Sequence, residues 1–143
     1  MSGDADELVR RLLEAFNRRD VEAVLCLLHR DVVFEPVSGV LLNSGQPYRG
    51  HAGVRRYFEH VEEHWRELQV TPFQIRAAGA AVVALGQTSG AGAGGALDAA
   101  PTTWVFKFRE GLVAQVQIFS DERLARRALS RIEEQAAQTS RRR

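Results

Sequence analysis

The chain has little of what marks secreted, membrane-spanning or nucleic-acid-binding proteins. It contains one cysteine, Cys26, so it cannot form an intrachain disulfide, which fits a reducing cytoplasm. Its formal net charge is only +1, which gives no electrostatic case for nucleic acid. No apolar run approaches the roughly 18 residues that cross a membrane, and the acidic residues 1–7 lack the order of a signal peptide. We therefore expect a cytoplasmic protein with no nucleic-acid and no membrane partner.

What is present is the composition of an ordinary globular domain. The hydrophobic fraction is 45% and the charged fraction is 26% over 143 residues. This length predicts a single domain over residues 1–143, with a core at about 5–125 and a C-terminal helix and basic tail at 126–143. Cys26 stands among valine and leucine residues, which predicts an inert core position.

The first half of the chain has helical periodicity. The spacing of apolar residues predicts helices from Asp4 or Asp6 to about Asn17, from the cap Asp20 to about Leu28, and from His51 to Trp65. Between the second and third helices, an apolar strand runs from Val32 to Glu35 and is stopped by Pro36. Residues 37–50 form a loop with an apolar patch at residues 40–42.

After Trp65 the period changes to two, which predicts four antiparallel strands at about 68–77, 80–88, 102–109 and 112–120. A phase slip at Thr71-Pro72 indicates a bulge or an edge strand. Glu110-Gly111 forms a hairpin turn, and the glycine- and alanine-rich residues 89–96 form a flexible loop. Asp121 then begins a final helix.

These elements predict an α+β fold, in which three helices lie across the concave face of a strongly curved, cone-shaped antiparallel sheet and a fourth helix ends the chain. Small cones and barrels of this kind often hold one apolar ligand. Aromatic and aliphatic side chains of the third helix and the last strands could line such a pocket or be plain core. The pocket residues that we expect are Tyr57, Phe58, Trp104, Phe106, Val116 and Ile118.

Four segments in order resemble the nuclear-transport-factor-2-like superfamily, in its SnoaL-like and ketosteroid-isomerase-like branches. They are Leu-Leu-Glu-Ala-Phe-Asn-Arg-Arg-Asp at 12–20, Leu-His-Arg-Asp-Val-Val-Phe-Glu-Pro at 28–36, Tyr-Arg-Gly-His-Ala-Gly-Val at 48–54, and Trp-Val-Phe-Lys-Phe-Arg-Glu-Gly-Leu-Val at 104–113, followed by Phe119-Ser120-Asp121. The resemblance covers roughly residues 5–125 and implies the cone-shaped fold.

The resemblance also implies two acids for proton transfer. Glu35 matches the general base of ketosteroid isomerases, and Asp121 matches the acid/base of SnoaL-like polyketide cyclases. Each has an alternative role: Glu35 as a rim carboxylate paired with Arg49 or Arg55, and Asp121 as the cap of the last helix.

Two departures from the ketosteroid isomerases disfavour steroid isomerisation. Leu12 stands where the isomerases carry an oxyanion-hole tyrosine, and Trp104 stands where they carry a protonated aspartate. His60 and His64 have the spacing of metal ligands but no third ligand, so we expect neither a metal nor another cofactor.

These observations predict a cofactor-independent, isomerase- or cyclase-like enzyme that transfers a proton on a small apolar carbonyl substrate. The alternative is a non-catalytic domain that binds a small apolar ligand or dimerises. Relatives pair through the outer face of the sheet, so we expect a homodimer through the face that carries Val105, Gln115, Gln117 and Phe119.

Overall fold

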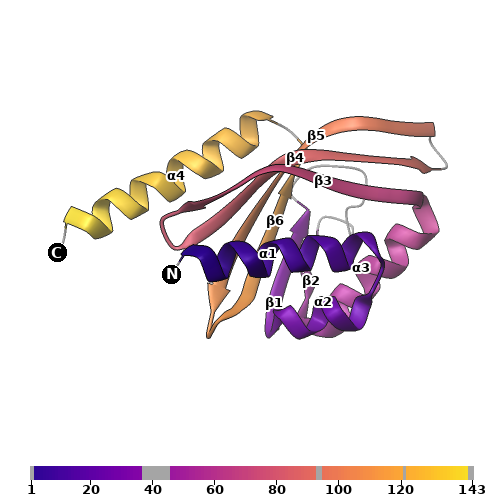
Figure 1. Ribbon diagram of the computed structural model, residues 1–143, viewed down its shortest axis with the longest axis horizontal. Coiled ribbons are helices and arrows are strands. Elements are labelled where there is room, and N and C mark those ends of the chain that lie inside the picture. Colours follow the sequence, from indigo (N-terminus) through magenta and orange to yellow (C-terminus); the bar gives the residue numbers. More distant parts are fainter. Residues whose placement is uncertain (1, 37–45, 93–94, 121, 142–143) are drawn as a thin grey trace.

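The computed structural model describes residues 2–36, 46–92, 95–120 and 122–141 (Figure 1). The helices are α1 (Ser2–Asn17), α2 (Val21–Leu27), α3 (Gly50–His64) and α4 (Glu122–Arg141). The strands are β1 (Leu28–Pro36), β2 (Tyr48–Arg49), β3 (Trp65–Ala78), β4 (Ala81–Gly92), β5 (Gly95–Arg109) and β6 (Leu112–Phe119). The predicted α+β class and the order of the elements are confirmed, with the short strand β2 added. No described helix is long and apolar enough to cross a membrane.

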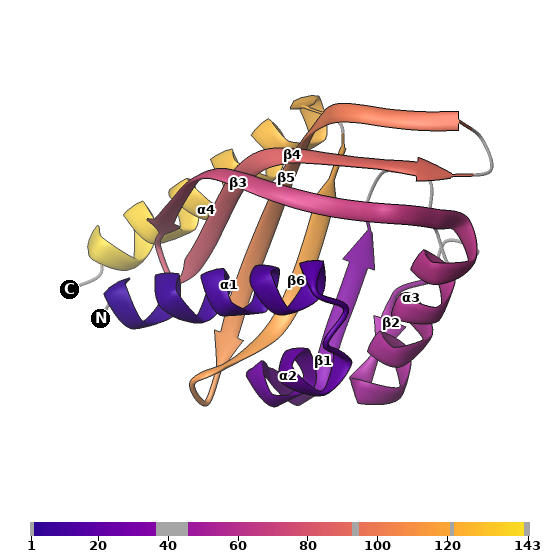
Figure 2. The ribbon, with the colours of Figure 1, turned by 45° about the vertical axis from the view of Figure 1, so that its right-hand side comes forward.

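The six strands form one curved sheet in the order β2-β1-β6-β5-β4-β3. Every pair is antiparallel except β1 and β6, which run parallel, so the sheet is mixed rather than purely antiparallel. Figure 2 shows the sheet bending around α1 and α3. This curvature places the central strands β1, β5 and β6 opposite the helices.

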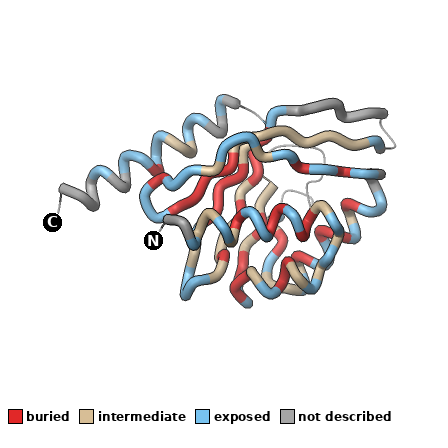
Figure 3. The backbone as a smooth tube through the Cα atoms, viewed as in Figure 1, coloured by how far each residue is buried: buried red, intermediate tan, exposed pale blue. Residues whose placement is uncertain are grey.

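The sheet has two buried faces. The larger core cluster joins α1, α2 and α3 to the concave face, with Phe34, Phe106 and Val116 among its members. The smaller cluster lies on the outer face, where Val105 and Phe119 pack with Ile132 of α4. Buried residues accordingly follow the central strands and the inner sides of the helices (Figure 3). The outer face on which a homodimer was expected is thus partly covered by α4 of the same chain.

The turn between α1 and α2 ties the helices to the edge strand β3. Asn17, the last residue of α1, donates from its amide to the carbonyl oxygen of Val70 and accepts from the Val70 N–H, both at 2.9 Å. Asp20 caps α2 by accepting from the N–H of Ala23 at 3.2 Å. Arg19 lies between them with a φ of 59°. The predicted helix boundary at Asn17 and the cap at Asp20 are confirmed.

The edge strand has the predicted irregularity. The β3–β4 register shifts between Pro72 and Gln74, which leaves Phe73 69% exposed. Gly86 of β4 faces this bulge so closely that a Cβ atom on it would lie 2.1 Å from the carbonyl oxygen of Thr71. The turn at Glu110-Gly111 is also confirmed, with both residues at positive φ.

Two expectations were wrong, and two others fall outside the described residues. The segment 89–96 is mostly strand rather than a loop, because β4 continues to Gly92 and β5 begins at Gly95. Cys26 is exposed, not buried, because Val24 and Leu25 fill the inner side of the short helix α2. The apolar patch at 40–42 and the acid Asp121 lie outside the described residues.

Candidate functional site

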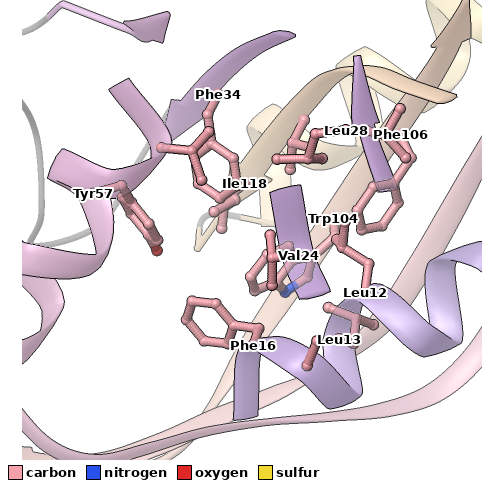
Figure 4. Close-up of a cluster of buried hydrophobic side chains, with 14 of the residues drawn as sticks. Leu12, Leu13, Phe16, Val24, Leu28, Phe34, Tyr57, Trp104, Phe106 and Ile118 are labelled. Atoms are coloured by element: carbon pink, nitrogen blue, oxygen red, sulfur yellow. The ribbon is translucent and has the colours of Figure 1, made fainter. Parts of the chain in front are cut away.

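Aromatic rings from four different elements, α1, α3, β1 and β5, meet on the concave side of the sheet (Figure 4). The ring centroid of Phe16, on α1, lies 5.9 Å from that of Trp104, 6.2 Å from that of Tyr57 and 5.4 Å from that of Phe58. Tyr57 also lies 4.4 Å from Phe34 of β1. We call these five residues the aromatic cluster. Helical spacing on α3 and alternation on β5 turn the side chains inward.

Trp104 carries a polar atom into this apolar cluster. The residue is 3% exposed, and its indole Nε1 is buried with no hydrogen-bond partner among the described residues. Buried polar groups are nearly always paired, because leaving one unpaired costs about 1–3 kcal/mol. Trp104 therefore places a buried hydrogen-bond donor in the cluster for which the described residues supply no acceptor.

Tyr57 brings a second ring with a polar atom, its hydroxyl oxygen, into the aromatic cluster. Burial raises the pKa of the Tyr57 phenol well above its ordinary value of 10.0, and the neighbouring Tyr48 adds to the effect. The phenol therefore stays protonated and able to donate at physiological pH. In Figure 4 its oxygen and the Trp104 nitrogen both point toward the part of the interior where Phe16 lies.

A hydrogen-bonded pair stands behind Tyr57. Tyr48 of β2 lies edge-on to Tyr57, with ring centroids 5.3 Å apart. Its hydroxyl is 2.6 Å from Nδ1 of His60 on α3, and burial raises the Tyr48 pKa. His60, which the sequence pairs with His64 at metal-ligand spacing, is thus engaged with a tyrosine.

Glu35 lies on the other face of the sheet from the aromatic cluster. Successive side chains of a strand point to opposite faces, and Phe34 belongs to the concave core. Glu35 pairs in register with Gln117, whose amide donates to the Glu35 carboxylate at 3.3 Å. Gln117 in turn is opposite Val105, which belongs to the outer cluster.

The other expected site residues are placed as follows. All six expected pocket residues are buried together in the concave core: Tyr57, Phe58, Trp104, Phe106, Val116 and Ile118. Leu12, which the resemblance matches to the tyrosine of ketosteroid isomerases, is buried in the same core, and its side chain offers no hydrogen-bond donor.

Sequence reasoning missed Phe16 and Tyr48 as members of this site. Phe16 looked like one more apolar residue of a helix face, and only its ring contacts with Trp104 and Tyr57 show its central place. Tyr48 precedes a glycine- and histidine-containing segment in a region that looked like loop, and it gave no periodic signal.

A surface groove of about 730 Å³ lies between α2 and α3. Its lining consists of Arg19, Val21, Arg55, Phe58, Glu59, Glu62 and Glu63. Arg19 stands 4.9 Å above the Phe16 ring and donates to the carbonyl oxygens of Phe16 and Leu68 and to the Glu62 carboxylate. Phe58 thus belongs to both the groove lining and the aromatic cluster, and Arg19 lies between the groove and the Phe16 ring.

The chain resembles several solved structures in fold. An NTF2-like protein of unknown function from Burkholderia pseudomallei is 27% identical, with a TM-score of 0.73 over 89% of this chain and 97% of that one. A candidate polyketide cyclase from Xanthomonas campestris is 23% identical, with a TM-score of 0.70 over 91% and 97% of the two chains. TerC, co-crystallised with polyporic acid, is 21% identical, with a TM-score of 0.72 over 87% and 96%.

No curated protein sequence matches the chain. The family model of the SnoaL-like domain matches residues 9–116, which include the second half of α1, all elements from α2 to β5, and most of β6. That match covers most of the chain and agrees with the fold of its structural neighbours. The chain therefore belongs to the SnoaL-like domain family.

Proposed function

We propose that this protein is a cofactor-independent enzyme that moves a proton beside the carbonyl group of a small, apolar substrate held against the aromatic cluster. The observation that carries the proposal is the buried indole N–H of Trp104, which has no partner among the described residues. An apolar wall with few polar groups is typical of small-molecule sites. The proposed reaction is an isomerisation or a cyclisation.

The chemical step needs a base and a place for negative charge. A carboxylate takes a proton from the carbon beside the carbonyl, the C–H electron pair becomes the C=C bond of an enolate, and the carbonyl π pair moves to oxygen. Return of the proton to another carbon gives an isomer, whereas attack of the enolate carbon on a second carbonyl of the substrate closes a ring. Both outcomes need only proton transfer.

Glu35 and Asp121 are the two carboxylates that we assign to this step, on the strength of the family resemblance. Glu35 sits beside Gln117 on the outer face, so it reaches the substrate only if the end of β1 turns its side chain inward. Asp121 follows β6, whose residue Ile118 belongs to the concave core. Single variants at the two positions separate their roles.

A second candidate function is non-catalytic binding of a small apolar ligand, and the outward position of Glu35 favours it. In that case the aromatic cluster binds the ligand and no carboxylate acts on it. Two structural neighbours suggest the kinds of molecule involved: one is a candidate polyketide cyclase, and TerC was co-crystallised with polyporic acid.

We also propose a cytoplasmic homodimer that pairs through the outer sheet face. Because Val105 and Phe119 are already buried beside α4, the contact would involve the half-buried Gln115 and Gln117. Analytical ultracentrifugation tests this part of the proposal: a monomer at micromolar concentration would remove it.

Deuterium exchange decides between catalysis and binding. The protein is incubated in deuterated buffer with 1-acetonaphthone, whose methyl protons are acidified by the carbonyl, and exchange is followed by NMR. Wild type is expected to exchange faster than a Glu35→Gln/Asp121→Asn double variant, and each single variant shows which acid contributes. If both proteins bind the ketone and exchange its protons at the same rate, the enzymatic function is contradicted and the non-catalytic binding function is supported.

A further inference from the structure

We infer that the indole N–H of Trp104 and the hydroxyl of Tyr57 together hold the carbonyl oxygen of the substrate, and that this substrate carries no charge at the bound group. The inference deepens the proposed function, since it names the groups that receive the substrate and the chemical class that they accept.

The first step rests on what an indole can do. Nε1 of Trp104 can only donate a hydrogen bond, it is buried, and it has no acceptor among the described residues. A ligand that relieves this unpaired donor must present an acceptor, and a ligand without one leaves the cost unrelieved. The site therefore distinguishes a carbonyl compound from a hydrocarbon of the same shape.

The second step concerns the position of Tyr57 relative to Trp104. They come from α3 and β5, and both rings pack against Phe16, at 6.2 Å and 5.9 Å between centroids. Figure 4 shows the hydroxyl oxygen and the indole nitrogen pointing toward the same side, that of Phe16. Because the Tyr57 phenol stays protonated, it is a donor there as well. A flat ligand against Phe16 therefore meets donors from two sides.

The third step concerns charge. Apart from tyrosine and tryptophan, the buried polar or charged residues in the described part of the chain are His29 and Thr102, and neither belongs to the aromatic cluster. Arg19 lies 4.9 Å from the centroid of the Phe16 ring, and its three guanidinium nitrogens already donate to Phe16, Leu68 and Glu62. A ligand carboxylate in the cluster would be a buried charge whose nearby cation, Arg19, is already paired with Glu62, which is costly. A neutral ketone meets no such cost.

Trp104 and Tyr57 also offer hydrogen-bond donors of the kind that ketosteroid isomerases take from a tyrosine and a protonated aspartate. Leu12 offers none, and Trp104 is not an acid, but a neutral indole and a neutral phenol can both stabilise an enolate oxygen as charge develops on it. The donors come from β5 and α3, rather than from α1 and β5. Trp104 and Tyr57 thus supply two hydrogen-bond donors for the enolate oxygen.

The test compares three naphthalene compounds that differ in one group: 1-acetonaphthone, 1-ethylnaphthalene and 1-naphthoate. Their dissociation constants are measured at neutral pH by ligand-observed NMR titration. We expect wild type to bind the ketone about 5- to 100-fold more tightly than the ethyl compound, and to bind the carboxylate most weakly. This order depends on binding alone, so it stands even if deuterium exchange shows no catalysis.

Variants then assign the preference to its donors. Trp104→Phe is expected to reduce the ketone-to-ethyl ratio to about 2 or less, and Tyr57→Phe, which removes only an oxygen atom, is expected to lower the ratio with the fold intact. Phe16→Leu is the matched control: it removes a ring but no donor, so both compounds weaken and the ratio is kept. A wild-type ratio near one, undetectable ketone binding, tighter binding of the carboxylate, or a ratio unchanged in both donor variants would overturn the inference.

Discussion

The side-chain amide of Asn17 pairs with the backbone of Val70 in both directions, at 2.9 Å for each hydrogen bond. Val70 lies on β3, the last strand in the order of the described sheet, so Asn17 takes the place of a strand partner at that point. The same turn continues into the cap at Asp20. The Asn-x-x-Asp sequence therefore joins the helical layer to the edge of the sheet.

Replacing Asn17 by alanine should destabilise the fold by about 2 kcal/mol, because the buried N–H and C=O groups of Val70 lose their partner. Urea unfolding measures the change. Gln69→Ala is the matched control, since Gln69 donates to the carbonyl oxygen of Asn17 only from an exposed position. That variant should cost less than about 0.5 kcal/mol. Equal effects of the two variants would show that the Asn17 amide does not secure the edge strand.

Gly86→Ala should be strongly destabilising, by about 2–3 kcal/mol or more, because the new methyl group meets the Thr71 carbonyl oxygen and the β3 bulge must shift. Gly111→Ala is the comparison: it has open space around the new atom but a φ of 78°, which costs about 1 kcal/mol. Thermal and urea unfolding rank the two variants. A Gly111→Ala variant less stable than Gly86→Ala would contradict the close approach at the bulge.

The two tyrosines should make the protein less stable in alkali. Burial raises the pKa of both Tyr48 and Tyr57 above 10.0, so the unfolded chain releases these protons at a lower pH than the folded chain. Their stabilising contribution is fully present below about pH 10 and is lost as pH rises, with a slope of at most about 1.4 kcal/mol per pH unit for each tyrosine. Urea unfolding between about pH 9 and pH 11 measures it.

Tyr57→Phe should remove the larger part of this alkaline slope. The chain has only two tyrosines, so the near-ultraviolet absorbance of tyrosinate reports them directly. In the native protein this absorbance should appear at a higher pH than in the urea-unfolded protein. Coincident titration curves for the native and unfolded protein would rule out the buried environment described for Tyr57.

Cys26 should react with a thiol reagent such as Ellman's reagent without unfolding, because its side chain is exposed on α2. The rate for the native protein should lie within about tenfold of the rate for the urea-unfolded protein, since a solvent-accessible thiol needs no opening of the fold. A native rate slower by several orders of magnitude would mean that the thiol is buried, as its apolar neighbours in sequence suggested.

The fold was predictable because its signals are local. Helical spacing, the cap at Asp20, the phase slip at Thr71-Pro72 and the turn at Glu110-Gly111 each depend on residues close together in the chain. The segment 89–96 misled because glycine and alanine have weak strand preference, whereas the β4–β5 ladder needs only backbone groups and continues through Gly90 and Leu97. The predicted burial of Cys26 was wrong because α2 is only about two turns long and mostly apolar, so its sequence does not indicate which face is buried.

The site was less predictable because it depends on which face of the sheet each side chain meets. The position of Glu35 before Pro36 suggested a base, but the pairing of β1 with β6 puts Glu35 beside Gln117 and turns Phe34 inward. The face of the sheet on which Glu35 lies depends on the pairing register of β1 and β6, which cannot be read from the sequence of one strand alone. The six expected pocket residues lie in one core, whereas the unpaired indole of Trp104 could be recognised only from its surroundings.

The most direct test of the account is an NMR measurement on the two tryptophan indole groups, of Trp65 and Trp104, during titration with 1-acetonaphthone. The signal that disappears in Trp104→Phe belongs to Trp104. On saturation with the ketone, that signal should move downfield, as expected for an N–H that gains an acceptor, and the shift should be absent with 1-ethylnaphthalene. Saturation with the ketone that leaves the Trp104 signal in place would contradict a substrate carbonyl held by Trp104.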